Sequence, residues 1–194
     1  AALLERSAAL QGYPEAVTAV LLAATEQAVT GVWPLSLKDS LDDADGVGAV
    51  HGEYALTIAS NYRRGNQSAV TAGFGKGYIY AASLPEDTFY SQAYWAKVPP
   101  LATLRVALVA SAQVACADPL HDGTCSLLAY PELGLWLYQG TSQKYYSGNY
   151  EGNYQYAFWR NTSLSSKTVA IKFQVGDWNG LSYLNYGVAW GTGG

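Results

Sequence analysis

The part of the chain after Asn61 has the texture of short β-strands, and this feature limits the protein to a small set of folds. Eight runs rich in β-branched and aromatic residues alternate with the turn-forming residues Gly, Pro, Asn, Asp and Ser. The runs cover residues 70–74, 77–82, 90–98, 104–112, 133–138, 154–159, 168–175 and 183–190. Because many short strands with turn signals between them are typical of sandwiches, we predict an antiparallel β-sandwich, jelly-roll-like, over residues 61–194.

The first sixty residues have a different pattern, which predicts helices. We expect one helix over residues 1–10 and a second from Pro14 to about residue 30, since Pro suits the first turn of a helix, where its missing N–H costs nothing. Apolar residues recur at helical spacing on one face of the second helix, at Val17, Val20, Leu21, Ala24 and Ala28. A short helix is also expected over residues 53–59. We therefore divide the chain into a helical segment, 1–60, and a sandwich domain, 61–194.

Composition excludes several classes of function. The 194 residues are 49% hydrophobic, which is enough for a sizeable core, and only 13% charged, with a formal net charge of −4. No basic stripe is present to neutralise phosphates, so nucleic-acid binding is not expected. The sequence contains no run of eighteen apolar residues, so no membrane-spanning helix is predicted. Since the chain opens at Ala1 and contains no Met, we expect it to be the mature remnant of a longer precursor.

The two cysteines flank a turn. Cys116 and Cys125 enclose eight residues that include Pro119 and Gly123. We predict a disulfide across this turn, worth roughly 2 to 3 kcal/mol in the chain-entropy model, and with it an oxidising, extracellular compartment. The alternative is a pair of buried thiols. A zinc site is not expected, because two sulfurs and the nearby His121 leave the tetrahedral ligand set incomplete.

Residues for nucleophilic catalysis are not recognisable. A nucleophilic Ser or Cys needs a base within hydrogen-bond reach, and the only histidines are His51 and His121. We interpret His51 as a partly exposed residue next to a helix start and His121 as a solvent-facing turn residue. Neither a Gly-Thr-Ser-x-Ala phrase nor a Gly-x-Ser-x-Gly elbow accompanies them. Catalysis by this chain alone is not expected.

An acidic cluster in the helical segment is a weak candidate for a calcium site, at Asp39, Asp42, Asp43 and Asp45. Aligned with an EF-hand loop through the last two of these, the segment has Leu41 where the first carboxylate belongs and Gly52 where the bidentate Glu belongs. The EF-hand motif therefore fails at both ends. A looser calcium site and a solvated acidic loop stay open as alternatives, and no other cofactor is expected.

A tyrosine-rich stretch follows residue 138 and predicts a contact surface, made of Tyr145, Tyr146, Tyr150, Tyr154 and Tyr156. Tyrosine among Gly, Ser, Asn and Gln is typical of adaptable binding surfaces. Alternation along residues 154–159 places aromatic residues on both faces of one strand, so some of them must line the sandwich core. Exposed members could contact protein or stack on sugar rings.

Two phrases of the helical segment resemble the end of a subtilisin-like serine peptidase domain. Residues 1–10 are similar to the tail of the helix that follows the nucleophilic serine in that family. The next helix and the closing Gly-x-Gly-x-Val turn of the family are matched by Pro14, Glu15, Val17, Leu21 or Leu22, Thr25, Gly46, Gly48, Val50 and Ala55. The sandwich resembles domains appended to bacterial secreted subtilases, in residues 133–138, 149–151 and 187–190. It departs from them at Gly134, where the family tends to carry an acidic residue, so calcium is not expected there.

The resemblance implies a noncatalytic C-terminal portion of a secreted subtilisin-like serine protease, which gives stability, substrate contact or assembly. Its partner would be the catalytic portion of the parent or other copies of the chain, because the apolar helical face needs a cover; the sandwich of the same chain is the third possible cover. Whether the protein belongs to an enzyme is open, since the parent would be a serine endopeptidase while this chain has no catalytic residues. The alternatives are an extracellular structural protein that self-assembles through strands and Tyr-rich surfaces, and a carbohydrate-binding module.

Overall fold

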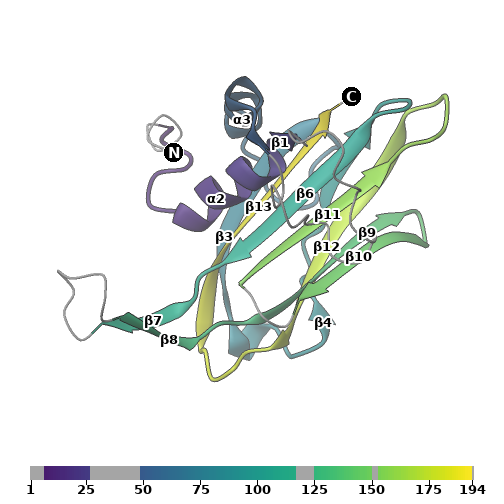
Figure 1. The fold of residues 1–194 in the computed structure, drawn as a ribbon. Coiled ribbons are helices and arrows are strands. Elements are labelled where there is room, and N and C mark those ends of the chain that lie inside the picture. Colours follow the sequence, from purple (N-terminus) through teal and green to yellow (C-terminus); the bar gives the residue numbers. More distant parts are fainter. Residues whose placement is uncertain (1–6, 27–48, 117–124, 150–152, 194) are drawn as a thin grey trace, which may run out of the picture.

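The computed structural model describes residues 7–26, 49–116, 125–149 and 153–193, and it is an antiparallel β-sandwich with helices on one outer face (Figure 1). The helices are α2 (Pro14–Ala23), α3 (Gly52–Ala59) and the short 3-10 turn η1 (Ala81–Ser83). The longer strands are β3 (Ala72–Tyr80), β5 (Tyr94–Val98), β6 (Thr103–Ala110), β9 (Glu132–Gln139), β10 (Ser142–Asn149), β11 (Tyr154–Arg160), β12 (Lys167–Asp177) and β13 (Tyr183–Gly193). Shorter ones are β1 (Thr25–Glu26), β2 (Ala49–Val50), β4 (Thr88–Phe89), β7 (Gln113–Cys116) and β8 (Cys125–Ala129).

The strands of the sandwich pair as a nested series, in which the first long strand pairs with the last and the strands nearest the middle pair with each other. Strand β3 pairs with β13, β4 and β5 pair with β12, β6 pairs with β11, and β9 and β10 form the central hairpin. This nested hairpin is rolled into two sheets, in the orders β10-β9-β12-β4, with β5 also on β12, and β11-β6-β13-β3. Such pairing is the jelly roll, so the predicted fold class is confirmed.

The strand limits differ from the prediction in several places. The strand expected over residues 90–98 begins only at Tyr94, and the short strands β4, β7 and β8 were not predicted. The two strands expected at 70–74 and 77–82 are the single strand β3, Ala72–Tyr80, whose three glycines do not interrupt it. Strand β10 was not predicted, since its sequence Ser-Gln-Lys-Tyr-Tyr-Ser-Gly-Asn lacks an apolar alternation. It lies at the end of its sheet and pairs only with β9, and an edge strand of this kind needs few apolar side chains.

The glycines of β3 make room for large aromatic residues in the core between the sheets. A Cβ at Gly73 would press on the ring of Trp190, and one at Gly75 or Gly77 would meet the ring of Tyr94 or Tyr186. All three aromatic side chains are almost fully buried. The Tyr94 and Tyr186 hydroxyls lie 3.0 Å apart and satisfy each other by a hydrogen bond. The small residues of one strand thus accept the large residues of its neighbours, as close packing requires.

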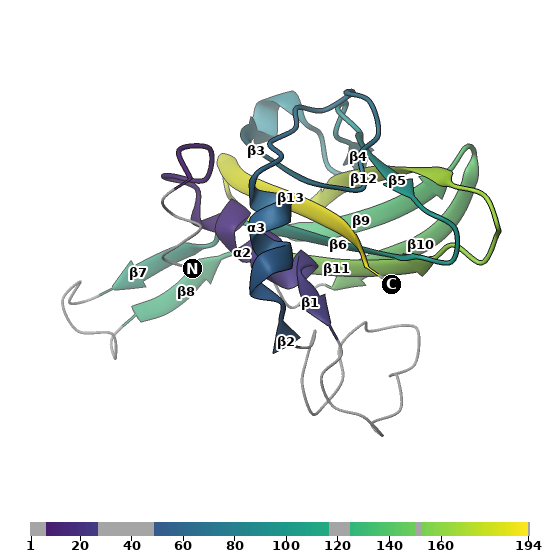
Figure 2. The same cartoon turned by 90° about the horizontal axis from the view of Figure 1, so that it is seen from above.

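The helices form a third layer on the outer face of the β11-β6-β13-β3 sheet (Figure 2). Ala16, Val17, Ala19, Val20 and Ala23 of α2 are buried there. They share one apolar cluster with side chains from that sheet, namely Phe74, Ala107, Val109, Tyr156 and Ala189. Of the three possible covers for this helical face, the structure contains the sandwich of the same chain. The buried face of α2 therefore gives no argument for a partner.

The helical segment also departs from its predicted limits. Helix α2 ends at Ala23 and not near residue 30, because Thr25 and Glu26 leave the helix and pair with β2. Of the helix expected over residues 1–10, the part at 7–10 is a turn, and residues 1–6 lie outside the described part. The short helix expected over 53–59 is confirmed as α3, one residue longer at its start. Neither α2 nor α3 has the length or the apolar run needed to cross a lipid bilayer.

The cysteines lie on the β7–β8 ribbon, which projects from the sandwich in both views (Figures 1 and 2). The register pairs Cys116 directly with Cys125 across the two strands. Residues directly opposite in an antiparallel pair have Cα atoms about 4.5–5.5 Å apart, which is within the range that a disulfide spans. Their side chains lie outside the described set, so the disulfide stays a prediction.

Candidate functional site

The described residues contain no pair of nucleophile and base. His51 is the one histidine among them, and its role is structural: it precedes α3, and its Nδ1 accepts a hydrogen bond of 3.1 Å from the backbone N–H of Tyr54. This side chain caps the helix by satisfying a donor that the first turn leaves free. His121 and the acidic cluster at Asp39, Asp42, Asp43 and Asp45 lie outside the described residues. Within the described part, no group of three or more His, Cys, Asp or Glu side chains is close enough to hold a metal ion.

The predicted tyrosine surface does not come together as one patch. Tyr156 is buried beneath the helical layer and Tyr154 is half-buried in the same cluster. Tyr145 packs against the core between the sheets, and its ring lies 5.5 Å from that of Phe158, which belongs to the same cluster as Tyr154 and Tyr156. Tyr146 is 42% exposed on the outer face of the β10-β9-β12-β4 sheet, and Tyr150 lies outside the described residues. The strand that carries Tyr154 and Tyr156 has aromatic side chains on both faces, as predicted.

A different set of tyrosines forms an exposed strip. Tyr78 and Tyr80 on β3 and Tyr183 on β13 are each more than half exposed. The register pairs Tyr183 with Tyr80, and the ring centroids are 6.2 Å apart; those of Tyr80 and Tyr78 are 5.5 Å apart. The three side chains lie on the outer face that also carries the helices. We call Tyr78, Tyr80 and Tyr183 the tyrosine strip.

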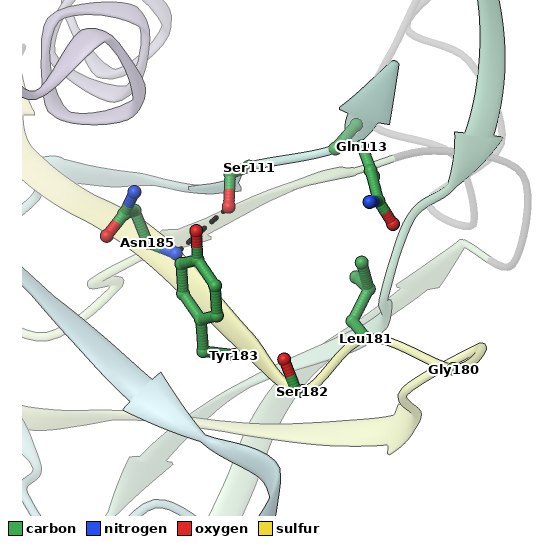
Figure 3. Close-up of a pocket in the computed structure, with 8 residues that line it drawn as sticks. Ser111, Gln113, Gly180, Leu181, Ser182, Tyr183 and Asn185 are labelled. Carbon is green, nitrogen blue, oxygen red and sulfur yellow. Dashed lines mark hydrogen bonds between the residues drawn. The ribbon is translucent and has the colours of Figure 1, made fainter. Parts of the chain in front are cut away.

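A pocket of about 300 Å³ opens beside this strip. It lies where the end of β6 leads into β7 and where the chain enters β13 (Figure 3). Tyr183 is shared with the strip, and the other lining residues are Ser111, Ala112, Gln113, Gly180, Leu181, Ser182 and Asn185. We call this the polar pocket. Every lining side chain that can form hydrogen bonds is an amide or a hydroxyl, and none is charged.

The backbone beneath the polar pocket is held firmly while its polar side chains are available. The Ser111 N–H donates to the Asn185 carbonyl at 2.8 Å, and the Ser111 Oγ accepts from the Asn185 N–H at 2.9 Å. This pair of bonds ties the end of β6 to β13. Within the described part of the chain, the side-chain amides of Gln113 and Asn185 and the hydroxyls of Ser182 and Tyr183 make no hydrogen bond. They offer donors and acceptors to a ligand.

The boundary between strip and helical layer lies at Lys76. Its ammonium sits 3.7 Å above the centre of the Tyr13 ring, close enough for a cation–π contact. Burial lowers the pKa of this lysine, since a charged ammonium loses solvation there. The contact anchors the segment that leads into α2. On the far side of Lys76, neither α2 nor α3 covers the tyrosine strip.

Sequence reasoning missed the strip, although the signal was present. Ile79 lies between Tyr78 and Tyr80 and is buried in the core. In a strand, alternate side chains point to opposite faces, so the two flanking tyrosines had to lie on the outside. The pairing with Tyr183 had no comparable signal, since more than a hundred residues separate the two strands.

Comparison with known proteins gave no match, either to a protein-family model or to a curated protein.

Proposed function

We propose that this chain is a noncatalytic contact module of a larger secreted protein, similar to the C-terminal portion of a subtilisin-like peptidase, and that it binds extended polypeptide substrate. The observation that carries the proposal is the tyrosine strip beside the polar pocket. A peptidase module that contacts substrate needs a surface that accepts many sequences and has no need of catalytic groups.

The chemistry of the surface fits an unfolded polypeptide. Tyrosine supplies a large, rigid contact area with a polar end at a low cost in conformational entropy, and Ser, Asn and Gln supply adaptable hydrogen bonds. Each peptide unit carries both a donor and an acceptor, which amide and hydroxyl side chains can satisfy together. Phosphorylated or strongly acidic ligands would call for Arg or Lys, and none lines the polar pocket.

The test measures binding of the purified chain to reduced, carboxymethylated lactalbumin, which serves as an unfolded polypeptide. The variant Tyr78→Ser/Tyr80→Ser/Tyr183→Ser is expected to weaken binding at least tenfold, because tyrosine anchors of this kind typically contribute more than about 1 kcal/mol each. All three side chains are more than half exposed, so the variant should keep the thermal midpoint of the parent.

The matched control is Leu164→Ser, which removes an apolar side chain that is 87% exposed and lies outside the strip and the pocket. It is expected to bind like the parent. If the parent chain does not bind the unfolded polypeptide, or if the triple variant binds as tightly as the control, the proposal is wrong.

Self-assembly through strands and Tyr-rich surfaces stays a prediction.

A further inference from the structure

The other face of the sandwich carries a second group of aromatic side chains. Phe89, Trp136, Tyr138 and Tyr146 lie on the outer face of the β10-β9-β12-β4 sheet. The helices α2 and α3 cover the other sheet (Figure 2). Phe89 and Tyr146 are 37% and 42% exposed, and the other two are half-buried. We call these four residues the aromatic platform. The proposed polypeptide surface lies on the opposite sheet, so a ligand of the platform would bind independently of it.

The rings of Trp136 and Tyr146, at the centre of the platform, lie close to the surface of the sheet. Trp136 and Tyr146 are direct partners in the β9–β10 register, with ring centroids 4.6 Å apart and ring planes 34° apart. Each ring leans over the glycine two residues away on its own strand. A Cβ added to Gly134 would overlap the Trp136 ring, and one added to Gly148 would overlap the Tyr146 ring. These glycines are also paired with each other. Because neither has a side chain, both rings can lie close to the backbone of the sheet.

Phe89 and Tyr138 complete the platform beside these rings. The Phe89 ring meets Trp136 edge-on, with centroids 5.0 Å apart and an interplanar angle of 82°. The Lys172 ammonium lies 5.6 Å from the centre of Phe89 and 5.5 Å from that of Tyr138. Edge-on and cation–π contacts of this kind stabilise the arrangement of the rings.

A hollow of about 230 Å³ adjoins the platform. Its lining combines the aromatic residues Trp136 and Tyr146 with the polar residues Asp87, Glu132 and Gln174, which we call the polar rim; Leu133, Gly134 and Gly176 complete it. The Gln174 Nε2 donates to Asp87 Oδ1 at 3.2 Å, which orients this carboxylate at the rim. The hollow therefore combines aromatic surface with two carboxylates and one amide.

We infer that the hollow binds a neutral pyranose unit of a polysaccharide. The apolar C–H face of a sugar ring can pack on aromatic surface, while its hydroxyls donate to carboxylates and exchange hydrogen bonds with an amide. Hydrogen bonds to ionised groups are the stronger ones, so Asp87 and Glu132 would fix the orientation of the sugar. These two carboxylates outnumber the Lys172 ammonium beside the platform and line the hollow itself, so they would repel a uronic acid or a sulfated sugar there.

The rim also argues against a protein partner at this place. The buried core of a protein interface is depleted of charged residues, and a stable one buries about 800 Å² on each side. Here two carboxylates border a hollow smaller than the ~300–1,000 Å³ typical of sites for drug-sized ligands. One sugar ring of a polysaccharide fits a hollow of this size, and the neighbouring rings of the same polysaccharide can extend over the platform.

The test is electrophoresis of the native chain in gels that contain a soluble neutral polysaccharide, either β-glucan, xylan or galactomannan, with alginate as the acidic comparison. At least one neutral polysaccharide is expected to retard the parent chain, and alginate is not. Trp136→Ala should abolish the retardation. Glu132→Gln, which preserves shape and removes one charged acceptor, should weaken the affinity about tenfold while leaving the thermal midpoint unchanged.

Tyr62→Ala is the aromatic control, because Tyr62 is 40% exposed and does not belong to the platform. Its retardation should equal that of the parent. The inference is overturned if no neutral polysaccharide retards the parent, if alginate alone does so, or if Glu132→Gln and Trp136→Ala are both retarded like the control.

Discussion

Tyr94 and Tyr186 show how a single pair of polar atoms can be kept in an apolar core. Each hydroxyl has the other as its partner at 3.0 Å, so neither is left unsatisfied. Burial raises the pKa of both hydroxyls well above the ordinary tyrosine value of about 10, since the phenolate would lose its solvation. Tyr156, beneath the helical layer, has its pKa raised for the same reason.

We predict that this pair makes the protein sensitive to alkali. In the unfolded chain both hydroxyls lose their protons near pH 10, while the folded chain holds them to higher pH. Their contribution to stability is therefore complete below pH 10 and is lost as the pH rises further. The free energy of unfolding should fall by about 1.4 kcal/mol per pH unit for each of the two tyrosines.

Urea unfolding between pH 8 and pH 11.5 measures this slope. The variant Tyr94→Phe/Tyr186→Phe removes both groups and should unfold with a shallower dependence on pH, whereas Tyr78→Phe, an exposed tyrosine, should keep the slope of the parent. Equal slopes for the double variant and the parent would contradict the assignment.

At the scale of elements, the contact between α2 and β13 determines where the helix sits. Gly187 of β13 lies directly beneath the first turn of α2, and a Cβ there would overlap the backbone N and Cα of Ala16. Backbone cannot swing aside as a long side chain can. The helix reaches the sheet this closely only because the strand has no side chain at that point.

Gly187→Ala is therefore expected to lift α2 from the sheet and to destabilise the fold by about 1–3 kcal/mol, the usual cost of overpacking a core. Thermal unfolding measures the change. Gly52→Ala is the matched control, since a Cβ at Gly52, the first residue of α3, meets nothing within 4 Å. That variant should be as stable as the parent or more stable by up to about 1 kcal/mol. Equal effects of the two substitutions would show that α2 does not depend on the close approach.

At the scale of the whole molecule, the helices and the sandwich share apolar side chains although they are separate in the sequence. The predicted boundary after residue 60 separates α3 from the strands, yet one cluster includes Ala55 and Ile58 of α3 together with Ala107 of β6 and Ala189 of β13. A cluster that spans the boundary ties both parts together energetically.

We expect the chain to unfold in a single cooperative step. The far-ultraviolet circular dichroism of the helices and the tryptophan fluorescence, to which Trp178 and Trp190 in the core between the sheets contribute, should change at the same denaturant concentration. Loss of the helical signal ahead of the fluorescence change would instead mean that α2 and α3 fold independently of the sandwich.

The sequence by itself determined the fold class and several elements to within a residue at each end, among them β9, β11 and α3. Short runs rich in β-branched and aromatic residues, separated by turn-forming residues, predict strands, and a series of such strands is typical of a sandwich or barrel. The helix expected over residues 53–59 is found at Gly52–Ala59, where the His51 side chain caps the first turn, so the element depends on contacts local in the sequence. His51 was correctly interpreted as a residue beside a helix start for the same reason.

Only the tertiary structure decided which strands pair and which tyrosines share a surface. Alternation tells which residues point to the same side of a strand, but not which other strand lies beside it. Tyr80 and Tyr183 meet because the first and last strands of the jelly roll are neighbours. Tyr146 is separated from Tyr145 because consecutive residues of β10 point to opposite faces of their sheet. The cover of α2 was likewise undetermined by sequence, since an apolar face accepts any apolar partner and the hydrophobic effect has no direction of its own.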